Sequence, residues 1–141
     1  MNCGEIIGTM NYLAVLVAAL SSFFVGWMWY GPLFGKLWMK LNGFTPEVLK
    51  EGGMSMPLIM GVNYIATFVA AFAIAMFLGF IDRFDAGSGI LTGLMIVVFW
   101  IATNRLNDVL YERKPFGLFI LNVGYSLVTF IIMGAIIGAW H

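Results

Sequence analysis

The chain has 141 residues, of which 62% are hydrophobic and only 10% are charged, and its formal net charge is zero. Soluble domains carry about 25% charged residues, so this composition excludes water as the main solvent of the chain. The mean hydropathy of +0.96 indicates an integral membrane protein, and the lack of a basic run argues against nucleic acid as a partner. The single cysteine, Cys3, excludes an internal disulfide and a cysteine-based metal cage.

Charged residues divide the chain into four long charge-free stretches, at 6–35, 52–81, 86–104 and 115–141. A helix needs about 20 apolar residues to cross the roughly 30 Å hydrocarbon core of a bilayer. The sequence therefore predicts an all-α integral membrane fold, a four-transmembrane-helix bundle that forms a single domain. We expect its helices near residues 11–31, 57–81, 88–110 and 116–139.

The first helix is not predicted to be a cleaved signal peptide. Signal peptides begin with a basic segment that is followed by a short apolar core. Residues 1–10 hold no lysine or arginine, and the apolar run that follows is too long. We expect this helix to stay in the membrane.

The end of the first helix carries an aromatic and basic motif. Tryptophan and tyrosine side chains followed by lysines are typical of a helix end at the cytoplasmic membrane interface. Proline ends or bends the helix there, because it cannot donate the next backbone hydrogen bond. Two further interpretations stay open: residues 34–38 lie along the membrane plane as an amphipathic segment, or the tryptophans and the lysine gate a polar layer in the bundle. We call these residues the interface motif: Trp27, Trp29, Tyr30, Pro32, Lys36 and Trp38.

Basic residues in the short loops predict the orientation. Loop 32–56 holds three lysines, and the segment after the third helix holds Arg105, Arg113 and Lys114. The N-terminus holds no basic residue, and loop 82–89 holds one. Because cytoplasmic loops carry the excess of lysine and arginine, we expect loop 32–56 and the third loop in the cytoplasm. Both termini are then expected outside the cytoplasm, in a multi-pass protein of the inner (plasma) membrane.

Stripes of small residues predict how the helices pack. Helices in lipid associate through the close approach of small residues. Three separate stripes on four short helices leave packing surface for a second copy, so we expect a homo-oligomer. The stripes are Ala14, Ala18, Ser22 and Gly26 in the first helix, Ala71, Ala75 and Gly79 in the second, and Gly134 and Gly138 in the fourth.

A faint internal repeat aligns the second helix with the fourth. It pairs Asn63 with Asn122 and Gly79 with Gly138. The two helices are expected to run in the same direction, so the bundle would consist of two parallel-repeat helical hairpins.

Three asparagines are expected at one depth in the membrane. Asn63, Asn104 and Asn122 each lie six residues from the expected cytoplasmic end of a helix, or about 9 Å at 1.5 Å per residue. In one interpretation the amides form hydrogen bonds to one another and stabilise the packing of the bundle, by about 0.6–2 kcal/mol per hydrogen bond. In the other they line a hydrated cavity that binds a small polar solute or a lipid headgroup. Tyr125 lies within a turn of this layer.

The segment 102–114 is the most polar helical part of the sequence. Arg105 and Asp108 lie one turn apart, and their pairing reduces the cost of an arginine near hydrocarbon. The pair either marks interfacial snorkelling or belongs to a site for an anionic headgroup or solute. The candidate ligand-binding residues are Asn63, Asn104, Arg105, Asp108, Asn122 and Tyr125.

No catalytic, metal or cofactor site is predicted. The only histidine is His141, and catalysis or metal binding by histidine needs a second positioned group. The expected spans hold no carboxylate near the membrane midplane, which argues against a proton-coupled antiporter. We therefore expect neither an enzyme nor a cofactor.

Residues 11–40, 102–128 and 133–140 resemble a small bacterial integral membrane family known as domain of unknown function 1761. Its members are similar in length and in four-helix hydropathy, and their first helix ends in W-Y-x-P-x-x-F-G-K-x-W. Here Trp29 to Trp38 read WYGPLFGKLW, with the phenylalanine one place earlier. The resemblance implies the architecture and brings no established activity.

Two functions are compatible with these patterns. The first is a homo-oligomeric binding or permeation module for a small polar solute or a membrane lipid. The alternative is a structural or accessory membrane subunit that has no ligand of its own and works with an unidentified membrane-protein partner.

Overall fold

The computed structural model describes residues 2–43 and 56–140, so the part of loop 32–56 that holds Lys50 lies outside the described residues. Its secondary structure is helical, and no strand occurs in these two ranges. The elements are α1 (Cys3–Thr9), α2 (Tyr12–Met28), the π-helical turn η1 (Trp29–Leu33), α3 (Gly35–Asn42), α5 (Met56–Ile81), α6 (Ala86–Ile96), the π-helical turn η2 (Val97–Ile101), α7 (Ala102–Leu110) and α8 (Phe116–Ala139).

Four of the helical runs are long and apolar enough to cross a membrane, which confirms the predicted all-α, four-helix fold. They correspond to α2 with η1, to α5, to α6 with η2 and α7, and to α8. Each lies within two residues of the predicted bounds. The spans are Tyr12–Leu33, Pro57–Ile81, Ala86–Leu110 and Phe116–Ala139.

The short helix α1 precedes the first span and was not predicted. The Asn2 side chain accepts a hydrogen bond from the Glu5 backbone N–H, and the Glu5 carboxylate accepts one from the Asn2 N–H. This reciprocal pair satisfies two donors that a helix start otherwise leaves unpaired. Ile6 is buried against Gly79 of α5, so α1 packs against the C-terminal part of that helix.

The third and fourth spans form the closest hairpin of the fold. A Cβ atom added to Gly89 would overlap the carbonyl of Gly134, and one added to Gly134 would overlap the carbonyl of Gly89. Gly93 meets the Phe130 carbonyl in the same way, and Gly138 meets the backbone of Asp85. Glycine at these four positions therefore lets the backbones of α6 and α8 touch, which is how small residues drive association in lipid.

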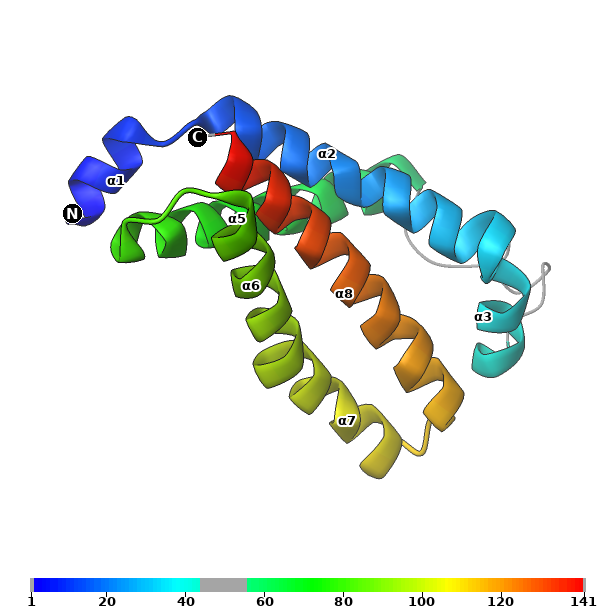
Figure 1. Cartoon of the computed structure of the whole chain (residues 1–141). Coiled ribbons are helices and arrows are strands. Elements are labelled where there is room, and N and C mark those ends of the chain that lie inside the picture. The colour runs from blue at the N-terminus through cyan, green and yellow to red at the C-terminus, as the bar shows by residue number, and fades with distance from the viewer. Residues whose placement is uncertain (1, 44–55, 141) are drawn as a thin grey trace.

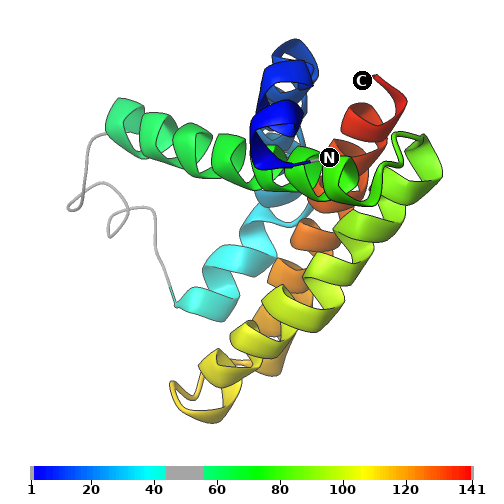
Figure 2. The same ribbon diagram turned by 90° about the vertical axis from the view of Figure 1, so that its left-hand side faces the viewer.

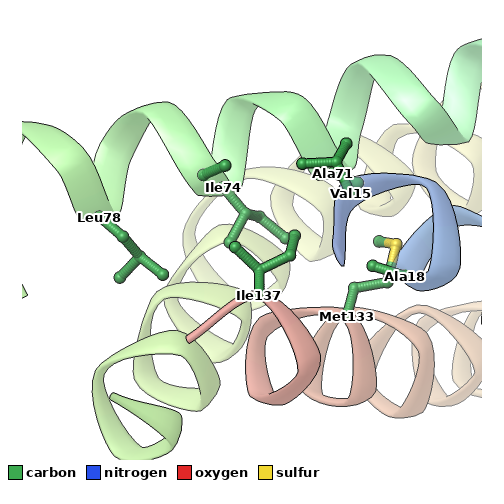
Figure 3. Close-up of a cluster of buried hydrophobic side chains, with 8 residues drawn as sticks. Val15, Ala18, Ala71, Ile74, Leu78, Met133 and Ile137 are labelled. Atoms are coloured by element: carbon green, nitrogen blue, oxygen red, sulfur yellow. The ribbon is translucent and has the colours of Figure 1, made fainter. Parts of the chain in front are cut away.

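The buried core lies at the end of the molecule that carries both termini, where α2, α5 and α8 meet (Figures 1 and 3). The Asn11 side chain donates to the Trp140 carbonyl at 3.1 Å and joins the start of α2 to the end of α8. The small stripes of the first two helices contribute to this core. Its members are Val15, Ala18, Ala71, Ile74, Ala75, Leu78, Met133 and Ile137.

The opposite end of the molecule is open. We call it the basic end, because it carries Lys36, Lys40, Arg113 and Lys114. None of the residues 57–70 of α5 is buried, and neither is any residue from 98 to 110. Figure 2 shows the N-terminal half of α5 projecting away from α8, and Figure 1 shows α7 diverging from α8. The described bundle is closed at one end and splayed at the other.

The two glycines that the repeat aligns have different neighbours. Gly79 packs against the Ile6 side chain of α1, whereas Gly138 packs against the Asp85 backbone before α6. The aligned positions therefore do not share a packing environment.

The first span ends as the Gly-Pro pair predicts. Pro32 lies in the π-helical turn η1, and the chain then turns into α3, the separate short helix at the interface motif (Figure 1). A Cβ on Gly35 would lie 2.7 Å from the Tyr30 carbonyl oxygen. Only glycine fits this turn without moving the backbone.

We predict that Gly89→Ala destabilises the protein by about 1–3 kcal/mol. We expect a value near the upper end of this range, because the added Cβ meets the backbone carbonyl of Gly134, which cannot rotate away as a side chain can. Thermal unfolding in mild detergent measures this. Gly61→Ala is the matched control, since nothing lies within 4 Å of a Cβ at Gly61. Equal stability of the two variants would contradict the glycine contact.

A second prediction concerns Asp85, which begins α6. Its carboxylate accepts hydrogen bonds from the Ser88 backbone N–H and hydroxyl, both at 2.8 Å. The backbone bond, followed by the hydroxyl bond, holds the pKa of Asp85 below its ordinary 3.8. Because the folded pKa is depressed, the stability that this group contributes is present above pH 3.8 and is lost as the pH falls through the folded value.

Asp85→Asn should therefore show a shallower loss of stability in acid, because asparagine still caps the helix but does not titrate. Melting temperatures measured between pH 6 and about pH 3 test this. Identical slopes for the two proteins would show that Asp85 does not contribute to acid sensitivity.

Candidate functional site

A cavity lies at the basic end, between α7 with η2 and the middle of α8. Its volume is about 540 Å³, and we call it the Arg105 cavity. A π-helical turn widens the helix by one residue per turn and often marks a functional site. Here η2 begins with the buried Val97 and separates α6, which has buried residues, from α7, which has none. The lining residues are Trp100, Ile101, Asn104, Arg105, Asp108 and Ser126.

The charged pair of this cavity is loosely held. A guanidinium nitrogen of Arg105 lies 3.7 Å from a carboxylate oxygen of Asp108, and the two side chains are 48% and 31% exposed. An exposed pair of this kind contributes about 0.2–1 kcal/mol. Guanidinium has five N–H donors in a planar fork, so Arg105 retains donors for a second anionic group.

The neutral polar side chains of the cavity add further hydrogen-bonding groups. The Asn104 amide nitrogen donates to the Trp100 carbonyl of its own helix at 2.8 Å, which orients the amide at the cavity wall. Ser126 is buried on α8 and faces the cavity from the other side. The site therefore combines a cation, a carboxylate, an amide and a hydroxyl.

An apolar cavity of about 300 Å³ adjoins the Arg105 cavity, and Trp100 lines both. Its other walls come from α5 and from α6 with η2. A polar cavity beside an apolar one suits an amphipathic molecule, with its charged group at Arg105 and its hydrocarbon beyond Trp100. The lining of this cavity, apolar apart from one threonine, consists of Ala73, Phe77, Thr92, Met95, Ile96, Phe99 and Trp100.

A third cavity, of about 200 Å³, lies between α5 and α8. We call it the Thr129 cavity. Ser126 lines it as well as the Arg105 cavity, so the two are neighbours across α8. Its walls are Asn63, Ala66, Thr67, Ala70, Tyr125, Ser126, Thr129, Phe130 and Met133.

Asn122 has a different role from the other two asparagines. Its amide oxygen accepts a hydrogen bond from the Tyr30 hydroxyl at 2.7 Å. The ring of Tyr30 lies between those of Trp38 and Tyr125, at centroid distances of 5.9 Å and 5.0 Å. This contact ties the end of the first span to α8.

The interface motif divides into an outward and an inward part. Trp27 is 66% exposed, as expected for the aromatic belt, and Lys36 is exposed on α3. Trp29 instead donates from Nε1 to the Leu121 carbonyl at 3.1 Å, and Tyr30 bonds Asn122. The inward part thus packs on α8 beside the candidate site.

The structure distributes the six candidate residues over three places. Asn104, Arg105 and Asp108 share the Arg105 cavity. Asn63 and Tyr125 line the Thr129 cavity, and Asn122 bonds Tyr30. Equal depth along three helices did not produce one site, because the helices diverge at the basic end.

Trp100 and Thr129 are among the cavity-lining residues that sequence reasoning missed. An aromatic residue or a threonine in an apolar span gives no signal by itself. The spacing of Asn122, Ser126 and Thr129 at i, i+4 and i+7, however, predicts one polar face on the fourth helix. Among residues 2–43 and 56–140, no group of three His, Cys, Asp or Glu side chains is placed to hold a metal ion.

Four apolar spans with an open polar end define a small multi-pass membrane protein. Residues 13–138 match the family of proteins of unknown function DUF1761. The chain therefore belongs to that family, as its motifs predicted. Neither the curated proteins nor the solved structures contain a match to this chain.

We predict that Tyr30→Phe and Asn122→Leu each lower stability, because each removes one partner of the same hydrogen bond. In a double-mutant cycle the coupling energy should be about 0.6–2 kcal/mol. Tyr111→Phe is the control, because Tyr111 is 81% exposed. Additive effects of the two changes would show that the bond does not stabilise the fold.

Proposed function

We propose that this protein is a homo-oligomeric binding module of the inner membrane, without catalytic activity of its own, that takes a small polar solute or a lipid through an anionic group held at Arg105. The single observation that carries the proposal is the Arg105 cavity itself. It places a loosely paired guanidinium, an amide and a hydroxyl around about 540 Å³ at the open end of the bundle. The basic residues at this end support its assignment to the cytoplasm.

Electrostatics favours an anionic group at this position. An arginine near hydrocarbon is costly unless it is paired or hydrated. Asp108 neutralises the Arg105 guanidinium only partly, because the two groups are 3.7 Å apart. Two phosphate oxygens can accept a bidentate pair of hydrogen bonds from a guanidinium. The adjoining apolar cavity beyond Trp100 favours a phosphate that carries a hydrocarbon chain over a free one.

The alternative, a structural or accessory subunit, has its own supporting observation. Asn122 is satisfied within the chain by Tyr30, as an asparagine used for packing would be. Under this alternative no ligand binds, and polar substitutions change only stability, oligomeric state or association with another membrane protein.

Native mass spectrometry of the protein in lipid nanodiscs tests the proposal. We expect a defined oligomer that retains phosphatidylglycerol in preference to phosphatidylcholine, and Arg105→Gln should reduce the retained lipid about 10-fold, as expected for the loss of a charge-assisted bond worth about 1.5–3 kcal/mol. Lys114→Gln is the matched control, because it removes one positive charge from an exposed pair with Glu112 outside the cavity.

Addition of inorganic phosphate distinguishes the two sources of the anionic group. Displacement of lipid by phosphate in the millimolar range would identify a solute site, and no displacement would identify a lipid site. Equal lipid retention by wild type, Arg105→Gln and Lys114→Gln, without phosphate binding, would contradict the proposal and favour the accessory subunit.

A further inference from the structure

The Thr129 cavity differs in chemistry from the Arg105 cavity. Its polar lining consists of hydroxyls and one amide, and it includes no charged side chain. Thr129 lies thirteen residues after the start of α8, or about 20 Å along a helix of about 36 Å at 1.5 Å per residue. The cavity thus reaches the middle of the span.

The Thr129 hydroxyl is the observation that requires an explanation. Thr129 is 4% exposed, and its Oγ atom is buried with no hydrogen-bond partner among the described residues. Threonine in a helix ordinarily bonds the carbonyl three or four residues earlier. Thr92, which is 5% exposed, does so by donating to the Ser88 carbonyl at 2.8 Å. An unsatisfied buried polar group costs about 1–3 kcal/mol.

Other polar groups surround this hydroxyl in a way that suits a small guest. Ser126 lies one turn before Thr129 on α8, and Asn63 and Thr67 face the cavity from α5. The Thr67 hydroxyl donates to the Asn63 carbonyl, so its oxygen can still accept a hydrogen bond from a guest. The Tyr125 hydroxyl makes only a long contact of 3.5 Å with the Ser22 carbonyl.

We propose that the Thr129 cavity is a second site within the span, which binds a small neutral hydrogen-bonding solute such as glycerol. The solute bonds the Thr129 hydroxyl and the Asn63 amide, one from each helix. Neutrality follows from the uncharged lining, because a charged guest at this depth would lack a counter-charge. The volume of about 200 Å³ corresponds to about six or seven waters at about 30 Å³ each, which is enough for one triol. This site does not depend on ligand binding at Arg105.

The test uses glycerol as the probe and the full-length protein in mild detergent. Glycerol at 1 M, and trehalose at the lower concentration that raises the melting temperature of a reference protein equally, both stabilise by exclusion from the protein surface. The disaccharide is too large for the cavity. The excess of the glycerol increment over the trehalose increment therefore reports occupancy. If the glycerol concentration is about ten times the Kd of the site, the excess is expected to be about 3–5 °C.

Thr129→Val should abolish this excess, because valine has the same shape without the hydroxyl. Thr129→Ser, which keeps the hydroxyl, should retain it, and Asn63→Ala should lose it from the other helix. Thr92→Val is the matched control: it removes a buried hydroxyl that is already bonded within its own helix, and the excess should persist. Arg105→Gln should also leave it unchanged.

The glycerol excess decides the outcome. An equal excess in wild type, Thr129→Val and Asn63→Ala would overturn the proposal, whatever the effect of the substitutions on stability, and so would no excess in wild type. Loss in Thr129→Val and Asn63→Ala together with retention in Thr129→Ser would support it. The stability of Thr129→Val in plain buffer is a second readout. A destabilised variant would support the proposal, because the hydroxyl then has a partner in the cavity. A stabilised variant would show that the hydroxyl has no partner and would count against it.

Discussion

The close contact of α6 with α8 is the constraint on which the rest of the structure depends. Gly89 and Gly134 bring two backbones so near that neither position accepts a Cβ. This contact lies toward the end that carries both termini, and the apolar core of α2, α5 and α8 lies at the same end. Tight packing at one end, combined with helices that are not parallel, separates the same helices at the other end. The Arg105 cavity, which is lined by residues of η2, α7 and α8, is therefore a consequence of the positions of Gly89 and Gly134.

The polar residues at the open end perform different tasks, although they look alike in the sequence. Asn122 accepts a bond from Tyr30 and fixes the first span on α8, whereas Asn104 and Asn63 line separate cavities on two sides of Ser126. An amide inside a membrane must find a partner, and the geometry decides whether that partner is the chain or a ligand. Asn122 and Asn104 both hydrogen-bond within the chain, and ligand binding by Asn63 and Asn104 stays a proposal.

The two proposed sites would divide recognition by charge. The Arg105 cavity holds an exposed cation and adjoins an apolar cavity at Trp100, which suits an amphipathic anion at the membrane surface. The Thr129 cavity lies deeper and has an uncharged polar lining, which suits a neutral solute. Ser126 separates them by the width of one helix. The two sites are proposed to act independently, since the lining of the Thr129 cavity includes no part of the Arg105–Asp108 pair.

The sequence by itself determined the solvent, the number of spans and their bounds, because apolar runs of membrane-spanning length and the positions of the charges depend only on local order along the chain. The stripes at Ala14 and Ala18 and at Gly134 and Gly138 also predicted packing faces. Only the tertiary structure decided which polar residues meet. Equal depth placed Asn63, Asn104 and Asn122 in one layer, but depth does not specify the angles between helices. The angle between α6 and α8 follows from the backbone contact at Gly89 and Gly134. Together with the direction of α5 it separated the three asparagines and left the Thr129 hydroxyl buried without a partner among the described residues.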